Sequence, residues 1–168
     1  MRIMTSNNLK DAFAGESQAH MKYTIFSDVA AKEGFPNTAR LFKAIARAEL
    51  VHARNHLKEL GGIQKSAENL QTAMDGEDFE VAEMYAAYKA VAELQNEKGA
   101  VRTTNYALEA EKIHSEMYNQ AKKTVAGGKD IEVGTIHVCE VCGHTVDGDA
   151  PDVCPVCSAP RSQFTAFQ

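Results

Sequence analysis

The sequence predicts a mainly α-helical protein, with a four-helix bundle in residues 1–130 and a small β/loop module in residues 131–168. Three observations support this fold class. Residues 6–126 carry apolar side chains at helical spacing almost throughout, with short breaks that contain glycine or asparagine. The two halves of this stretch repeat one another at a spacing of 61 or 62 residues. All four cysteines lie in the last 30 residues, where β-branched residues, prolines and turns replace the helical pattern.

The first two helices form the first half of the repeat. Ser6 can cap the first helix, which residues 34–37 break. Asn37 can cap the second helix, which residues 61–62 end. Each helix has an apolar stripe that also carries acidic or histidine side chains. The polar residues on these two stripes are Glu16, His20, Glu49 and His52.

The third and fourth helices form the second half. The third helix is expected to begin near Ser66, and a weaker break at residues 96–99 separates it from the fourth. The fourth helix runs to Ala126, and residues 127–130 end it and act as a linker. The acidic and histidine residues on the inward stripes of these helices are Glu77, Glu111 and His114.

The repeat matches residue types that are unusual inside a helical bundle. The matched pairs are Glu16 with Glu77, Glu49 with Glu111, and His52 with His114. Chance matches are expected between alanine-rich helices, but not among buried acids and histidines. The sequence therefore predicts two helix pairs of similar design.

Four glutamates and two histidines on inward helix faces predict a shared cation. Each Glu-x-x-His pair places an acid and an imidazole one turn apart on one face. Burying an unpaired carboxylate costs several kcal/mol or raises its pKa until it is neutral. A single Glu-x-x-His is common on solvated helices, and His20 and His56 read as core-edge or surface histidines. The full set matches the ligand pattern of di-iron carboxylate bundles, with one Glu from each of two helices and Glu-x-x-His from each of the others.

Glu80 breaks the repeat, because its counterpart in the first half is Ala19. Five glutamates would leave a charge of about +1 with two ferric ions and about −1 with two ferrous ions. A site that stays close to neutral in both oxidation states suits redox cycling. The alternative is that Glu80 is a solvated surface residue.

Two Cys-x-x-Cys pairs, separated by 11 residues, predict one tetrahedral metal site. In a reducing compartment, paired cysteines hold metal more often than they form disulfides. So short a module cannot bury enough apolar surface by itself, so the metal supplies its stability. The spacing alone slightly favours zinc in a structural ribbon, although a tetrathiolate site accepts iron as well. The four ligands are Cys139, Cys142, Cys154 and Cys157.

Composition excludes two classes of partner. The net charge is −5, and no basic patch suited to a nucleic-acid backbone is visible. No stretch approaches the ~20 apolar residues that a membrane span needs, and the N-terminal residues lack the apolar run of a secretory signal. We therefore expect a cytoplasmic protein without nucleic-acid or membrane partners.

Taken together, these motifs resemble the rubrerythrin family, in which a ferritin-like di-iron domain precedes a rubredoxin-like domain. The resemblance covers essentially the whole length. It includes Ala14-Gly15-Glu16-Ser17, both Glu-x-x-His pairs, Gly76-Glu77-x-x-Glu80-x-x-x-Met84-Tyr85, Cys142-Gly143, Ala150-Pro151 and Cys154-Pro155. It implies that two iron ions are bound by Glu16, Glu49, His52, Glu77, Glu80, Glu111 and His114.

The resemblance also implies particular roles within this ligand set. Glu49 and Glu111 would bridge the two irons. One iron would exchange Glu80 for His52 on reduction. Tyr23 and Tyr85 would hydrogen-bond ligand carboxylates from outside the coordination shell, although aromatic packing alone is the simpler reading of both.

The function implied by the resemblance is reduction of hydrogen peroxide to water, as a defence against oxidative stress. A rubredoxin-like Fe(Cys)4 centre would return electrons from rubredoxin or an NAD(P)H-linked rubredoxin reductase, since no glycine-rich dinucleotide motif is present here. The competing hypothesis is a ferritin-like iron-oxidising or iron-binding protein with a structural zinc ribbon. The metal at the cysteines discriminates between the two.

The short link between the second and third helices predicts a homodimer with exchanged helix pairs. In ferritin-like bundles these helices run parallel, so the link must travel back along the bundle. At ~1.5 Å per residue, the second helix after His52 and the third helix before Glu77 together require a return of about 28 Å. Residues 61–65 reach only about 17 Å. Residues 6–60 of one chain should then pack against residues 66–126 of its partner.

Overall fold

The computed structural model describes all 168 residues, which form two compact units, Met1–Gln64 and Lys65–Gln168. The first unit is a pair of helices. The second combines two further helical segments with a small sheet. None of the helices has the length and apolar character that crossing a membrane requires.

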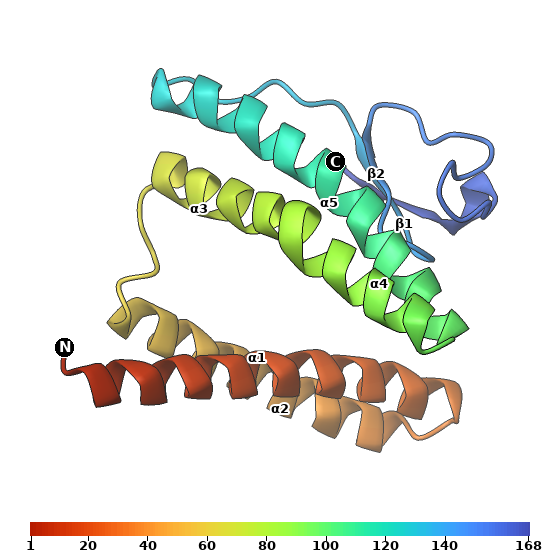
Figure 1. Cartoon of the computed structure of the whole chain (residues 1–168). Helices are drawn as coiled ribbons and strands as arrows, with labels where there is room; N and C mark the ends of the chain where they lie inside the picture. Colours follow the sequence, from red (N-terminus) through yellow and green to blue (C-terminus); the bar gives the residue numbers. More distant parts are fainter. The chain divides into compact units, whose positions relative to one another are not determined.

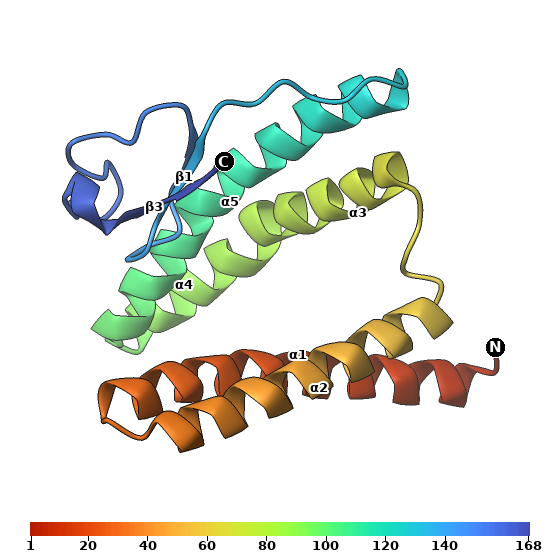
Figure 2. The same ribbon diagram turned by 180° about the vertical axis from the view of Figure 1, so that it is seen from behind.

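The first unit consists of α1 (Ile3–Lys32) and α2 (Pro36–Glu59), which lie side by side and antiparallel in both views (Figures 1 and 2). Gly34 reverses the chain with a φ of +83°, a conformation that glycine adopts without steric cost. The amide of Phe35 then donates to the carbonyl of Ala30 at 2.8 Å. Pro36 is the first residue of α2, where its missing N–H removes no bond within the helix.

The two helix caps predicted from the sequence are wrong. Ser6 lies within α1, and its amide donates to the carbonyl of Arg2 at 2.9 Å. Asn37 lies within α2, because the fixed φ of Pro36 starts the helix one residue earlier. Its side-chain oxygen accepts a hydrogen bond from Arg40 at 3.0 Å instead of capping the helix.

Small side chains line the contact between α1 and α2. Alanines allow two helix backbones to approach closely, and polar side chains then reach across to backbone carbonyls. The hydroxyl of Ser27 donates to the carbonyl of Ala39 at 2.9 Å, and Nδ1 of His20 lies 2.8 Å from the carbonyl of Ala46. His20 is therefore a packing histidine at the core edge. The buried residues of this pair are Ser27, Ala30, Ala39, Ala46 and Ala53.

The helices of the second unit form another antiparallel pair. One long helix is built from α3 (Ser66–Phe79), a π-helical turn η1 (Glu80–Met84) and α4 (Tyr85–Leu94). It packs along α5 (Lys98–Ala126), as Figure 1 shows. The predicted start at Ser66 and end at Ala126 are confirmed. The π-helical turn was not predicted.

The C-terminal part of the second unit is a three-stranded antiparallel sheet. Its strands are β1 (Ile136–Cys139), β2 (Thr145–Asp147) and β3 (Phe164–Phe167), in the order β2-β1-β3. A short 3-10 helix η2 (Arg161–Gln163) precedes β3. The core is small and is built around the cysteines, with Ala159, Val156, Phe164 and, from α5, Tyr106 packed against them. So small a core fits the expectation that a bound metal stabilises this part of the chain.

Candidate metal centres

The first unit brings three of the predicted ligands together. Glu49 and His52 lie one turn apart on α2, and Glu16 approaches them from α1. Nδ1 of His52 is 3.0 Å from Oε2 of Glu49 and 3.7 Å from Oε1 of Glu16. The three ligand atoms lie within 4.8 Å of one another, the spacing expected around one metal ion.

The two carboxylates of this group interact strongly in the absence of a cation. A side-chain hydrogen bond with Glu49 raises the pKa of Glu16, and the same bond lowers the pKa of Glu49. Two carboxylates at this distance share a proton because both cannot carry a charge so close together. A divalent or trivalent cation would replace that proton, so the group fits a metal site.

The second unit contains the repeat-related group of Glu77, Glu111 and His114. Their ligand atoms also lie within 4.8 Å of one another. Nδ1 of His114 is 2.7 Å from Oε2 of Glu111, both on α5. Burial, followed by the hydrogen bond and negative charge of Glu111, raises the pKa of Glu77 to about 7. This acid pair is more shielded than the first and likewise fits a cation.

Glu80 lies next to this second group without being one of its three members. It is the first residue of the π-helical turn and is partly buried. Burial raises its pKa, and the charge of Glu111 raises it further. Glu80 is therefore near enough to Glu111 to feel its charge, and its role as a ligand stays a prediction.

The two predicted tyrosines differ in their surroundings. Burial raises the pKa of Tyr85, and the charges of Glu80, Glu111 and Glu77 add to the shift, so its hydroxyl lies close to the acidic cluster. Tyr23 packs in an aromatic group, with ring centroids 6.3 Å from Phe26 and 6.2 Å from Phe42. The proximity of Tyr85 to the carboxylates suits the predicted hydrogen bond to a ligand. The packing of Tyr23 is equally compatible with a structural role.

The four predicted cysteine ligands converge on one point. Their sulfur atoms lie within 4.8 Å of one another, with Sγ of Cys139 3.6 Å from that of Cys157 and Sγ of Cys142 3.5 Å from that of Cys154. A tetrahedral ion with ~2.3 Å metal–sulfur bonds requires sulfur–sulfur separations of roughly 3.8 Å. The geometry therefore fits a metal ion and excludes a disulfide, whose sulfurs would be bonded at ~2.0 Å.

Backbone amides prepare one of these sulfurs to bind metal. Burial alone would raise the pKa of Cys154, but hydrogen bonds from the backbone N–H groups of Cys157 and Val156, together with side-chain hydrogen bonds with Cys142 and Cys157, outweigh it and lower the pKa to about 7. Such bonds stabilise the thiolate, which is the form that binds metal. Burial raises the pKa of Cys142 well above its ordinary value, so a cation must supply the charge that keeps its thiolate deprotonated.

The π-helical turn was not predicted, although the sequence contains a signal for it. Glu16 and Glu77 are 61 residues apart, but Tyr23 and Tyr85 are 62 apart. One extra residue therefore lies between Glu77 and Tyr85, which is where the turn occurs. A π-turn accommodates one inserted residue inside a helix and is frequent at functional sites.

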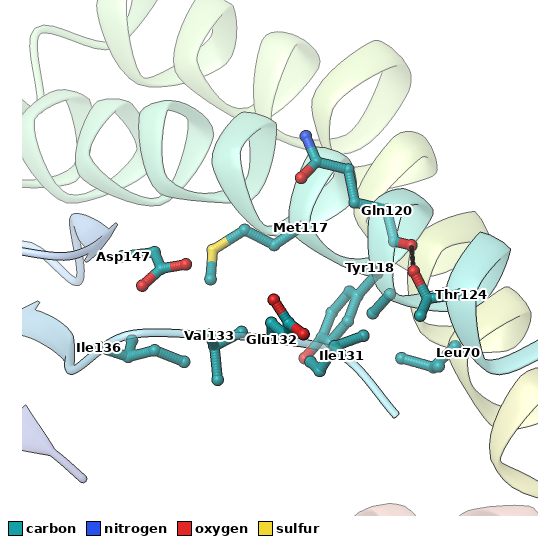
Figure 3. A pocket seen from close by; sticks show the side chains of 11 residues that line it. Leu70, Met117, Tyr118, Gln120, Thr124, Ile131, Glu132, Val133, Ile136 and Asp147 are labelled. Carbon is teal, nitrogen blue, oxygen red and sulfur yellow. Dashed lines mark hydrogen bonds between the residues drawn. The ribbon is translucent and has the colours of Figure 1, made fainter. Parts of the chain in front are cut away.

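A separate cavity of about 340 Å³ lies between α5 and the segment that leads to the sheet. Figure 3 shows Met117 and Tyr118 of α5 and Ile131 and Val133 of that segment around it, with Leu70 of α3 at one side. None of the predicted metal ligands lines it. The cavity therefore marks where the C-terminal segment lies along α5, and not a metal site.

Comparisons with known proteins agree with both metal centres. A family model described as rubrerythrin matches residues 7–122, and a second, described as the rubredoxin-like domain of rubrerythrin, matches residues 137–165. Rubrerythrin-2 of Clostridium acetobutylicum is 41% identical over 98% of this chain and 97% of its own length. Nigerythrin of Nitratidesulfovibrio vulgaris is 33% identical over 97% of this chain and 86% of its own length.

A solved structure agrees with the sequence comparisons. The structure of the fully reduced, all-ferrous state of nigerythrin has a TM-score of 0.55 and 33% identity to this chain, covering 97% of it and 86% of that chain. The matches, together with the carboxylate–histidine and cysteine clusters, confirm the predicted fold class and the predicted cofactor sites, a di-iron site and a rubredoxin-like four-cysteine metal site. The chain therefore belongs to the rubrerythrin family of iron oxidoreductases.

Proposed function

We propose that this protein reduces hydrogen peroxide to water at its di-iron site, and that the four-cysteine iron then transfers electrons that re-reduce that site. The observation that carries the proposal is the presence, in one chain, of two matched Glu/Glu/His groups and a tetrathiolate. Two ferrous ions, when bound, supply the two electrons that reductive cleavage of hydrogen peroxide requires. The reaction consumes one peroxide, two electrons and two protons, and it yields two waters.

The proposed iron ligands are the seven acidic and histidine residues predicted from the sequence. Glu16, Glu49 and His52 would form one half of the site, and Glu77, Glu80, Glu111 and His114 the other. Glu49 and Glu111 would be the bridges, as the family resemblance implies, and each lies within hydrogen-bond distance of the histidine one turn later. Support for Glu80 as a further ligand comes from its burial and its closeness to Glu111.

Tyr85 would keep a proton beside the proposed iron ligands. Tyr85 keeps its proton to high pH because its pKa is raised by burial and by three nearby glutamates. Tyr85 can therefore donate a hydrogen bond at the acidic cluster at any physiological pH.

The electrons are proposed to come from rubredoxin or an NAD(P)H-linked rubredoxin reductase, in the cytoplasm. The functional modules are proposed to be residues 1–130 and 131–168, because the first range contains all the carboxylate and histidine ligands and the second contains all four cysteines. Steady-state peroxide consumption, measured with NADH, a rubredoxin reductase and rubredoxin, tests the activity. A protein loaded with iron at both sites that fails to consume peroxide under these conditions contradicts the proposal.

The second candidate function is iron oxidation and binding, with zinc at the cysteines. Its support is the Cys-x-x-Cys spacing, which zinc ribbons also use. An iron tetrathiolate absorbs visible light strongly, whereas a zinc tetrathiolate is colourless. The metal content and visible spectrum of the purified protein therefore choose between the two candidates.

For assembly, we propose a homodimer that exchanges helix pairs. The bounds of α2 and α3 put about 10 Å of helix after His52 and about 16 Å before Glu77, at ~1.5 Å per residue. A parallel arrangement thus requires a return of about 26 Å. The seven steps from Glu59 to Ser66 reach about 23 Å when fully extended.

That link is not extended. The amide of Gly62 donates back to the carbonyl of Leu57 at 2.9 Å, and Gly61 has a φ of +72°. This turn closes the end of α2 and shortens the reach of the link well below its extended length. Exchange of identical helix pairs between two copies removes the need for the long return.

A further inference from the structure

His114 makes a second contact on the side of its ring that faces away from the acids. Its Nε2 lies 2.9 Å from Oγ1 of Thr145, the first residue of β2. Its Nδ1 lies 2.7 Å from Oε2 of Glu111. This is the one hydrogen bond between α5 and the sheet, and it joins residues 31 positions apart. Thr145 is buried, so water does not compete for its hydroxyl.

The proton of the Thr145 hydroxyl is already used. Oγ1 of Thr145 donates to the carbonyl of Gly143 at 3.0 Å. A hydroxyl has one proton, so toward His114 its oxygen can only accept. Nε2 of His114 must then carry a hydrogen, which leaves Nδ1 as the nitrogen that faces the carboxylates. A histidine ligand typically donates its second N–H to a protein acceptor, which fixes the tautomer and ring orientation.

The repeat-related histidine has no such support. Nδ1 of His52 faces Glu49 and Glu16 as Nδ1 of His114 faces Glu111, but no residue of its unit accepts a bond from its Nε2. Its side chain is 53% exposed, against 28% for His114. Within their own units, the two histidines are therefore held differently, His114 on both sides of its ring and His52 on one side.

The contact between His114 and Thr145 lies next to a cysteine ligand in the chain. Gly143, whose carbonyl accepts from Thr145, follows Cys142 in the chain, and its amide donates to the carbonyl of Cys139 at 2.8 Å. The backbone approaches α5 closely here, since a Cβ on Gly143 would lie 3.9 Å from Cβ of Ala110. Tyr106, one turn before Ala110, packs against the cysteine cluster.

We propose that Thr145 is a positioning residue that links the two metal sites: its hydroxyl fixes His114 with Nε2 protonated and Nδ1 toward the metal, and joins this ligand to the carbonyl of Gly143, the residue that follows Cys142. The hydrogen-bonded route runs from the ring of His114 through Oγ1 of Thr145 to the carbonyl of Gly143. The contact thereby gives the four-cysteine centre a defined place against the helix that carries Glu111 and His114.

Zinc-loaded protein tests the proposal, because it is diamagnetic and its result does not depend on peroxide reduction. Long-range ¹H–¹⁵N NMR of the histidines should show His114 bound through Nδ1, with an Nε2 proton that exchanges slowly. Thr145→Val keeps the shape of the side chain and removes the hydroxyl, so this proton should exchange rapidly. Thr145→Ser should restore its protection. Coordination of zinc through Nε2 in the unsubstituted protein overturns the proposal without any variant.

Thr165 of β3 provides a matched control, because β2 and β3 flank β1 on opposite sides. Thr145 and Thr165 both pair with Val138, but Thr165 is exposed and makes no side-chain hydrogen bond. Thr145→Val should weaken zinc binding at the carboxylate–histidine site by about 10- to 100-fold, whereas Thr165→Val should leave it unchanged. Equal affinity and equal protection of the Nε2 proton in the two valine variants would rule out the positioning role.

Discussion

Glu80 on the π-helical turn and Glu111 on α5 approach closely enough that the charge of Glu111 adds to the effect of burial in raising the pKa of Glu80. Glu80 is the first residue of the π-helical turn, and its counterpart in α1 at the 61-residue spacing is Ala19. The second half of the repeat thus carries a carboxylate that the first half lacks. If Glu80 is a ligand as proposed, this asymmetry predicts a site whose two irons are not equivalent.

Glu80→Ala should slow peroxide turnover by on the order of tenfold or more, while the protein still binds two iron ions at this site. The other four glutamates and two histidines remain to hold the metal, but the charge balance between oxidation states is lost. Turnover and iron content of the variant provide the measurement. Glu83→Ala is the control, because Glu83 lies on the same turn but is exposed. Unchanged activity in Glu80→Ala would mean that Glu80 acts only as a surface residue.

Cys154→Ser should leave the di-iron site intact and abolish NADH-dependent turnover through rubredoxin reductase. The substitution removes the thiolate that the amides of Cys157 and Val156 stabilise, so the tetrathiolate can no longer carry electrons. A chemical reductant that reaches the di-iron site directly should restore peroxide reduction. If this variant keeps full NADH-dependent activity, the two metal sites are not in series.

The metal-free protein should become less stable as the pH rises from about 4.5 to about 7. Glu77 has an ordinary pKa of 4.5 when unfolded and a pKa of about 7 when folded, so the folded protein binds the extra proton in this range. Stability falls with pH wherever the folded state binds more protons. The loss should be on the order of 1 kcal/mol, after allowing for solvent around a partly exposed group.

Thermal unfolding of chelator-treated protein across this range checks the pH prediction. Glu77→Gln cannot ionise at this position, so the fall should be much smaller in that variant. Metal-loaded protein should show the opposite trend, because metal binding requires deprotonated ligands. If the stability of the metal-free protein rises with pH, and rises equally in the unsubstituted protein and in Glu77→Gln, then Glu77 does not carry the effect.

Helix exchange predicts complementation between two inactive chains. Glu16→Ala removes a ligand from α1, and Glu111→Ala removes a proposed bridge from α5, so each variant alone should be inactive. After joint unfolding and refolding, a mixed dimer with exchanged helices has one site with both defects and one intact site. Equal mixing should then recover about a quarter of the unsubstituted activity, since half of the dimers are mixed and each has one working site of two. Proven mixed dimers without activity would exclude exchange.

The sequence predicted the local features of this protein well, because periodicity and spacing are local. The stripe that contains Glu77, the end of α5 at Ala126 and the convergence of the four cysteines all follow from such patterns. The caps at Ser6 and Asn37 were wrong because other residues began each helix earlier. The contact between His114 and Thr145 could not be predicted, since it joins a helix to a strand with no shared period.

The visible spectrum of the purified protein through one redox cycle tests whether the two metal sites act in series on peroxide. The protein should be red from its iron tetrathiolate, lose the colour with dithionite, and regain it when hydrogen peroxide is added without oxygen. Recovery at the rate of turnover is expected because electrons pass from the four-cysteine iron to the di-iron site and on to peroxide. A colourless, zinc-loaded protein with full NADH-dependent activity, or a bleached protein that peroxide does not recolour, would contradict the account.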